Sequence, residues 1–217
     1  MTGLTLVLVV LAAPVALVNW VGTARDDRRL VVAAKPTTLV LLILAALAID
    51  ADDPTVRLWF VVGLVLSLAG DVFLMLPEDT ELPLPPFLLG LGAFLLGHIA
   101  YVVGMAGDLD SWSFVLYGVL VVAAAGGVVA PRIVGGVRRT SPELVVPVLA
   151  YMAVISTMVV FSFGRGSAVG IVGALLFYAS DAILAWNRFV SPSRVLQVAV
   201  MVTYHLAQLG LVLSIAG

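Results

Sequence analysis

The chain has 217 residues, of which 62% are hydrophobic and only 11% are charged. Soluble domains are typically about 45–50% apolar, so this composition, with a mean hydropathy of +1.18, excludes a soluble domain and predicts an integral membrane protein. The net charge of -2 leaves no basic surface for nucleic acid. The absence of cysteine excludes disulfides, thiol nucleophiles and thiolate metal sites.

Eight apolar segments are long enough to cross a bilayer, which takes about 20 helical residues. Short connections rich in proline, glycine and charged residues separate them. The sequence therefore predicts an all-α polytopic bundle of eight transmembrane helices in a single membrane domain, 1–217. The expected helices cover residues 3 to 22, 31 to 49, 56 to 76, 86 to 106, 112 to 130, 143 to 163, 167 to 186 and 195 to 216.

Arginines in the loops predict the orientation of the chain. Arg57 and Arg165 fall on one side of the membrane, whereas the other side holds Arg25, Arg28, Arg29, Arg132, Arg138, Arg139, Arg188 and Arg194. Cytoplasmic loops are enriched in Lys and Arg, so the side with more arginines is expected to be cytoplasmic and both termini are expected outside. The expected location is a bacterial plasma membrane.

The two halves of the chain carry similar short motifs in the same order. The matched residues are Pro36 and Pro147, which are 111 apart, Asp71 and Asp181, which are 110 apart, and His98 and His205, which are 107 apart. Because each half holds an even number of helices, residues 1–107 and 112–217 would form parallel repeats related by an axis along the membrane normal. Chance matching among apolar segments of low diversity is the alternative.

Two aspartates lie inside predicted membrane helices, where a carboxylate costs about 2.5–3.5 kcal/mol and marks a functional site by default. Asp71 and Asp181 each lie about five residues, or ~7.5 Å of helical rise, from the cytoplasmic end. Lys35 and Asn19 reach a similar depth. The two aspartates are the candidate catalytic residues, and a structural ion pair with Lys35 is the alternative.

Further polar residues sit deeper in the predicted bundle. Helical spacing places His98 and Tyr101 on one face of the fourth helix, while Tyr178 and Ser67 each lie one turn before an aspartate and can reach it. The alternatives are hydrogen bonds between helices for the tyrosines and amides, and buried packing for the histidines. The candidate substrate-binding residues are Lys35, Asn19, His98, Tyr101, Tyr178, Tyr204, His205 and Gln208.

Two carboxylates in a medium of low dielectric constant can supply both an acid and a base, because ionisation of one disfavours ionisation of the other. Such a pair suits an acid-catalysed hydrolysis through an oxocarbenium-like species. The pair titrates as a unit, so which aspartate is the acid and which is the base stays open. The chain carries no HExxH, GxSxG or phosphate-binding glycine motif, and we expect no metal and no cofactor.

Five motifs in order resemble the signature of the YhhN-like lysoplasmalogenase family: "KPTT" at 35, "GDVFLML" at 70, "FLLGHIAY" at 94, "YASDAILAWNRF" at 178 and "TYHLAQ" at 203. The resemblance covers nearly the whole chain. It implies a membrane hydrolase, without a cofactor, that cleaves the vinyl ether bond of lysoplasmalogens to a fatty aldehyde and glycerophosphoethanolamine or glycerophosphocholine. Carried over by motif, Lys35, Asp71, His98 and Asp181 line the site, whereas His205 stands where relatives are expected to have tyrosine.

The expected mechanism assigns one aspartic acid to protonate the vinyl ether carbon and the other to stabilise the cation or activate water. Lys35 would bind the phosphate or keep one aspartate ionised. We expect the pocket to open to the cytoplasmic leaflet or the cytoplasm, with a polar mouth near Lys35 and a closed apolar end, and to take a lysophospholipid whose ether bond lies alongside both aspartates. A proton-coupled transporter and a lipid-binding protein without turnover are the alternative functions, and headgroup preference and oligomeric state stay open.

Overall fold

The computed structural model describes residues 2–216, and within them every regular element is a helix. Eight of these helices are long and apolar enough to cross a membrane. The predicted all-α bundle of eight transmembrane helices is therefore confirmed. The helices are α1 (Gly3–Arg25), α2 (Arg28–Ala48), α3 (Pro54–Met75), α4 (Pro86–Ala106), α5 (Trp112–Thr140), α6 (Val145–Arg165), α7 (Ala168–Phe189) and α8 (Arg194–Leu213), with a 3₁₀ turn, η1 (Pro142–Leu144), before α6.

Most of these helices are capped at the N-terminus by a side-chain oxygen. The oxygen accepts a hydrogen bond from a backbone N–H group of the first turn, which has no partner within the helix. These caps are Thr2, Asp27, Asp53, Ser111 and Ser167. The connections α1–α2 and α6–α7 have two residues each: Asp26 and Gly166 adopt left-handed conformations at φ 59° and 78°, and Asp27 and Ser167 already cap the next helix. Tight connections of this kind keep polar backbone close to the bundle ends.

Helix α5 differs from its prediction, because it continues through Pro131 to Thr140 instead of ending at residue 130. Proline removes one backbone donor, and here tertiary packing outweighs that loss. Ile133 and Val137 are buried against Val148 of α6 and Phe189 of α7. The rest of α5 is largely exposed on the outside of the bundle, where it would face lipid.

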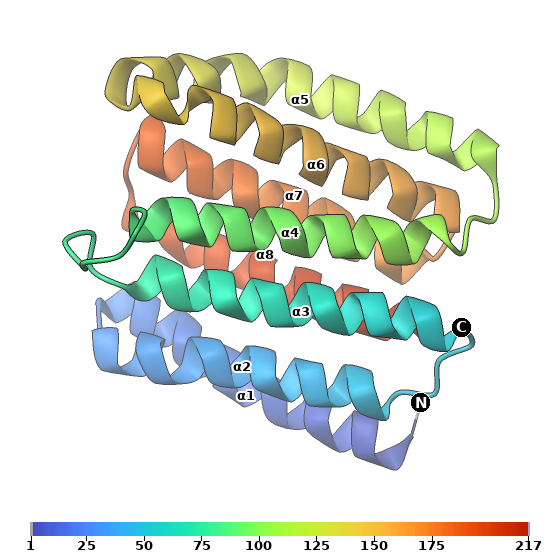
Figure 1. Cartoon of the computed structure of the whole chain (residues 1–217). Coiled ribbons are helices and arrows are strands. Elements are labelled where there is room, and N and C mark those ends of the chain that lie inside the picture. The colour runs from blue at the N-terminus through green and yellow to red at the C-terminus, as the bar shows by residue number, and fades with distance from the viewer. Residues whose placement is uncertain (1, 217) are drawn as a thin grey trace.

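The helices run roughly parallel and antiparallel to one another, with both chain ends at the same end of the bundle (Figure 1). In the described part of the chain, consecutive helices pack on each other except for α4 and α5, and contacts between helices distant in sequence close the bundle, since α4 packs on α6 and α8 packs on both α1 and α2. Within residues 2–216, α4 and α5 do not pack against each other. Glycines permit the closest hairpins, since Gly97 of α4 faces the backbone of Gly63 in α3 and Gly210 of α8 faces Gly173 in α7.

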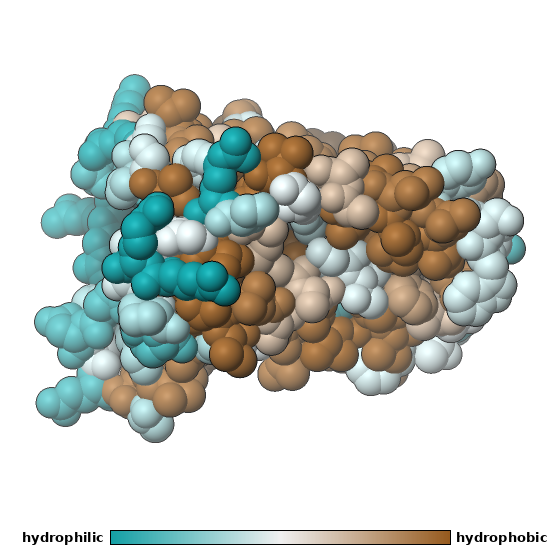
Figure 2. Space-filling view, turned by 90° about the horizontal axis from the view of Figure 1, so that it is seen from above, coloured by the Kyte–Doolittle hydropathy of each residue, from teal (hydrophilic) through white to brown (hydrophobic). Residues whose placement is uncertain are grey.

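Hydrophilic side chains gather at one end of the molecule, and a hydrophobic belt covers its middle (Figure 2). The loop arginines that the sequence places on one side all lie in or near this end, which we call the arginine-rich end. Arg57 and Arg165 lie toward the opposite, terminal end, with both chain termini. The two predicted sides are thus the two ends of one bundle.

Cysteine labelling tests which end faces the cytoplasm, because the chain has no native cysteine. Ser191→Cys lies in the exposed α7–α8 connection, and Asp52→Cys lies in the exposed α2–α3 connection. If the arginine-rich end is cytoplasmic, a membrane-impermeant maleimide added to intact cells should label only Asp52→Cys. Labelling of Ser191→Cys in intact cells would reverse the orientation.

Candidate active site

Asp71 is sealed inside the bundle in an ion pair. Its side chain is 1% exposed, and its Oδ1 lies 2.8 Å from Nζ of Lys35 on α2. Tyr204 of α8 donates its hydroxyl hydrogen to Oδ2 at 2.8 Å. Both carboxylate oxygens are therefore engaged, and the lysine charge offsets the carboxylate charge. The geometry favours the alternative in which Asp71 belongs to an ion pair with Lys35.

Asp181 has different partners and is open to a cavity. Tyr151 of α6 donates its hydroxyl hydrogen to Oδ2, and Nε2 of His98 on α4 lies 3.2 Å from the same oxygen. Nε2 also lies 2.9 Å from the Tyr151 hydroxyl, which closes a triangle of three side chains. The Asp181 side chain is 13% exposed, and no hydrogen bond within residues 2–216 engages its Oδ1. This oxygen is available to a bound molecule.

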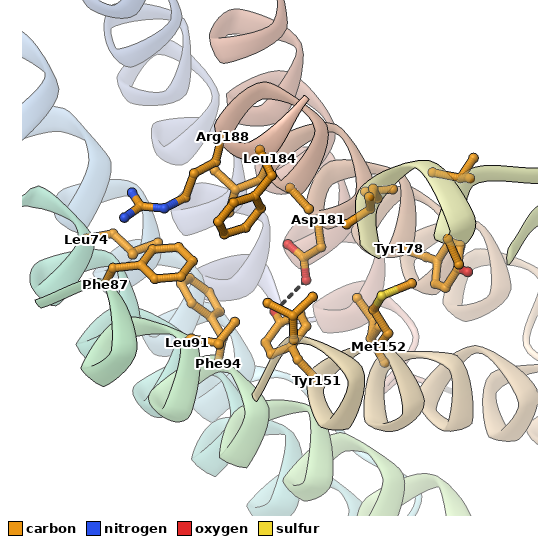
Figure 3. A pocket seen from close by; sticks show the side chains of 18 residues that line it. Leu74, Phe87, Leu91, Phe94, Tyr151, Met152, Tyr178, Asp181, Leu184 and Arg188 are labelled. Atoms are coloured by element: carbon orange, nitrogen blue, oxygen red, sulfur yellow. Dashed lines mark hydrogen bonds between the residues drawn. The ribbon is translucent and has the colours of Figure 1, made fainter. Parts of the chain in front are cut away.

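An apolar pocket runs beside Asp181 toward the arginine-rich end (Figure 3). Aromatic and aliphatic side chains of α4, α5, α6 and α7 form most of its wall. The polar or charged residues in the wall are Tyr151, Tyr178, Asp181 and Arg188. The composition of this wall suits a ligand that combines an apolar chain with a polar group.

A second, more polar pocket lies at the same end of the bundle and includes Lys35. Neither Asp71 nor Asp181 lines it. The expectation that Lys35 and both aspartates line one pocket is thus wrong, because Lys35 lines one pocket, Asp181 lines another and Asp71 lines neither. Leu74 and Leu184 line both pockets and form a shared wall.

The two aspartates belong to separate clusters and share no hydrogen bond. The buried ring of Phe177 lies between the clusters, with its centroid 4.6 Å from the His98 ring and 5.4 Å from the Tyr204 ring. Direct proton sharing between Asp71 and Asp181 would need a contact that this geometry lacks. Of the two carboxylates, Asp181 is the one with access to the apolar pocket.

The hydroxyls predicted to reach the aspartates have other positions. Ser67 donates to the carbonyl of Gly63 in its own helix at 2.8 Å. Tyr178 lines the apolar pocket, but its side chain points away from Asp181 toward α5 (Figure 3). Ser67 and Tyr178, which the sequence places within reach of the aspartates, therefore do not bond to them, because the rotation of each helix directs these side chains elsewhere.

The remaining candidates lie deep between helices and line neither pocket. Tyr101 donates to Oε1 of Gln208 at 2.7 Å and joins α4 to α8. Nδ1 of His205 accepts from Nε1 of Trp20 on α1 at 3.0 Å. Asn19 is fully buried, and its amide finds no partner within residues 2–216. For Tyr101, Gln208 and His205 this placement favours hydrogen bonding between helices over contact with substrate, whereas Asn19 makes no such bond.

Two residues of the site were not predicted from the sequence: Tyr151, which donates a hydrogen bond to Asp181, and Arg188, which lines the apolar pocket. A signal for Tyr151 was present in the predicted repeat, which pairs α2 with α6. Because α2 supplies Lys35 to Asp71, the repeat implies that α6 supplies a polar side chain to Asp181. Tyr151 lies four residues after Pro147, the α6 counterpart of Pro36.

Comparisons with known proteins give the family. The sequence model of the YhhN family matches residues 30–215. The chain belongs to the YhhN family. Members of similar sequence include the human protein named lysoplasmalogenase TMEM86B, 32% identical over 70% of this chain and 61% of the relative. The pig protein of the same name is 33% identical over 71% of this chain and 62% of the relative.

A bacterial relative named lysoplasmalogenase, from Mycobacterium tuberculosis, is 29% identical over 77% of this chain and 64% of its own length. The match therefore spans less than two thirds of each of these three relatives. No solved structure matches the chain. Within this YhhN chain, the family match covers both aspartate clusters and begins after α1, so Asn19 and Trp20 lie outside it.

Replacing one member of the Lys35–Asp71 pair tests its structural role. Lys35→Met leaves a buried carboxylate uncompensated and should lower the free energy of unfolding by about 3–5 kcal/mol. The double variant Lys35→Met/Asp71→Leu removes both charges and should recover most of this loss. Thermal unfolding in detergent measures both, and equal stability of the single and double variants would contradict the ion-pair assignment.

Proposed function

We propose that this protein is a membrane lysoplasmalogenase, which hydrolyses the vinyl ether bond of a lysoplasmalogen to a fatty aldehyde and a glycerophospho-base. The observation that carries the proposal is the accessible Asp181 carboxyl in the wall of an apolar pocket. Hydrolysis of a vinyl ether requires an acid to protonate its double bond. The apolar wall of the pocket suits the hydrocarbon part of the lipid. The names of the human and mycobacterial relatives support the same activity.

The substrate would lie with its hydrocarbon chain among the apolar residues of α4, α5 and α6. Its vinyl ether would lie beside Oδ1 of Asp181, the oxygen that makes no hydrogen bond to the protein. Tyr151 and His98 hold Oδ2, so they fix the direction of the carboxyl group. Both are positioning residues in this scheme, and Asp181 is the catalytic residue.

Catalysis begins with transfer of a proton from Asp181 to the vinyl carbon that does not bear oxygen. The π electrons of the double bond form the new C–H bond, and an oxocarbenium ion forms at the carbon that bears oxygen. Asp181 becomes a carboxylate beside this cation and stabilises it electrostatically, an interaction that is strong where water is scarce.

Water then adds to the oxocarbenium carbon and returns a proton to Asp181, which gives a hemiacetal. The hemiacetal C–O bond to glycerol breaks, the hydroxyl proton ends on the glycerol oxygen, and the aldehyde carbonyl forms. The water would enter either from the end of the pocket beside the exposed Arg188 or from the more polar pocket on the other side of Leu74 and Leu184. One water is consumed, and the acid is regenerated.

In this scheme Asp71 is a positioning residue that acts through its ion pair with Lys35 and through Tyr204. Its carboxyl is too enclosed to meet a lipid, whereas Asp181 opens to the cavity. We place the arginine-rich end in the cytoplasm of a bacterium, so that the substrate comes from the inner leaflet of the plasma membrane. No cofactor takes part in these steps.

Asp181→Asn should lower kcat by at least about 10², the scale of a lost general acid. Tyr151→Phe removes one hydrogen bond to the carboxyl and should cost about tenfold, equivalent to ~1.4 kcal/mol. Release of fatty aldehyde from lysoplasmalogen by purified protein measures both. Matched controls are Asp50→Asn and Tyr117→Phe, which are exposed and should retain wild-type turnover.

The role of Asp71 is tested with the charge-free pair Lys35→Met/Asp71→Leu. If Asp71 acts only through its ion pair, the folded double variant should keep turnover within about tenfold of wild type, far above the loss of a general acid. A loss as large as that of Asp181→Asn would assign Asp71 to the chemistry. Absence of aldehyde release from the wild-type protein would instead favour a lipid-binding or transport role.

A further inference from the structure

A charged pair lies where the apolar pocket reaches the arginine-rich end. Arg188 lines the pocket, and its guanidinium lies 2.9 Å from a carboxylate oxygen of Glu78 in the α3–α4 loop. The guanidinium carbon also lies 3.7 Å from the centroid of the Phe87 ring (Figure 3). Phe87 is itself buried in an apolar cluster, so it holds the guanidinium in one plane.

Both charged side chains remain within reach of a ligand. Arg188 is 39% exposed and Glu78 is 58% exposed, so the pair can open without the cost of uncovering a buried charge. Lys35 is unsuited to the same task, because it is 7% exposed, is paired with Asp71 and does not line the apolar pocket. Arg188 is thus the cation through which this pocket can bind an anion.

The spacing of Arg188 and Asp181 along α7 is comparable to the spacing of phosphate and vinyl ether in a lysophospholipid. Arg188 follows Asp181 by seven residues on α7, so the Cα atoms of the two residues are separated by about 10.5 Å of rise on nearly the same helix face. In an extended lysoplasmalogen, seven bonds of about 1.5 Å separate phosphorus from the vinyl carbon that accepts the proton, a span of roughly 9 Å. A lipid whose vinyl ether lies beside Asp181 therefore has its phosphate beside Arg188.

We infer that Arg188 and Glu78 form a headgroup site that selects zwitterionic lysophospholipids, with Arg188 binding the phosphate and Glu78 binding the ammonium group. The inference rests on the proposed function. In the empty pocket the two side chains neutralise each other. When the phosphate takes the guanidinium, Glu78 loses its partner, and a phosphoethanolamine or phosphocholine group supplies a new one. A headgroup that ends in a bare phosphate instead brings negative charge next to Glu78.

Binding of lipids that cannot be cleaved tests the site without turnover. The probes are saturated 1-O-alkyl lysolipids with phosphoethanolamine, phosphocholine or bare phosphate headgroups, titrated into the protein in neutral nanodiscs and followed by thermal stabilisation. Wild type should bind either zwitterionic lipid at least about fivefold more tightly than the bare phosphate. Glu78→Gln should reduce this preference to below about twofold, and Arg188→Gln should weaken zwitterionic binding by at least about fivefold.

Matched controls lie at the same end of the molecule. Glu81→Gln is exposed in the same loop, and Arg194→Gln breaks an exposed ion pair with Asp26 that lies outside the apolar pocket. Neither should change the preference. Arg188→Lys keeps the charge but not the planar stacking, and it should bind with intermediate affinity. The melting temperature without lipid separates loss of folding from loss of binding.

The outcomes separate the headgroup site from the proposed reaction. A wild-type protein without headgroup preference, a preference unchanged in Glu78→Gln, or unchanged binding in Arg188→Gln would overturn the site even if lysoplasmalogen is cleaved. Headgroup selection that depends on both side chains, in a protein that releases no aldehyde, would support the site and reject the hydrolase.

Discussion

The cost of placing carboxylates within the membrane governs the arrangement of this bundle. Two aspartates lie where charge is expensive, and each recruits side chains from two other helices. Lys35 and Tyr204 tie α2 and α8 to Asp71, whereas Tyr151 and His98 tie α6 and α4 to Asp181. Most of the interior helices are joined through these two side chains.

The two clusters correspond under the predicted repeat, which exchanges α2 with α6, α3 with α7 and α4 with α8. Their surroundings nevertheless differ. Helix α1 packs on α8, with Trp20 donating to His205, and Asp71 is enclosed. The corresponding helix α5 does not pack on α4, and Asp181 is open to the apolar pocket. The two clusters thus differ in the outer helix beside them, and one carboxylate is enclosed while the other is accessible.

The sequence was sufficient to predict the helices and the buried acids, because both follow from the hydrophobicity of individual segments. It was insufficient where packing between helices determines the end of a helix or the direction of a side chain. Pro131 suggested the end of α5, yet contacts of Ile133 and Val137 with distant helices continue the helix. Tyr178 and Tyr151 were both near enough in depth to reach Asp181, and only the rotation of α6 and α7 determines that Tyr151 does so. Lys35 lies at a level in the membrane similar to that of both aspartates, so the sequence could not tell which of them it contacts. The rotation of α2 directs its side chain to Asp71.

The separation of α4 and α5 has a consequence for the products of the proposed reaction. Both helices line the apolar pocket without close backbone contact between them, so a separation of their side chains would open the pocket toward the hydrocarbon of the bilayer, in addition to its end near Arg188. Hydrolysis would divide one amphiphile into a membrane-soluble aldehyde and a water-soluble phosphodiester. Each product would then leave by a different path into the phase that dissolves it, and a reactive aldehyde would pass into lipid without crossing water.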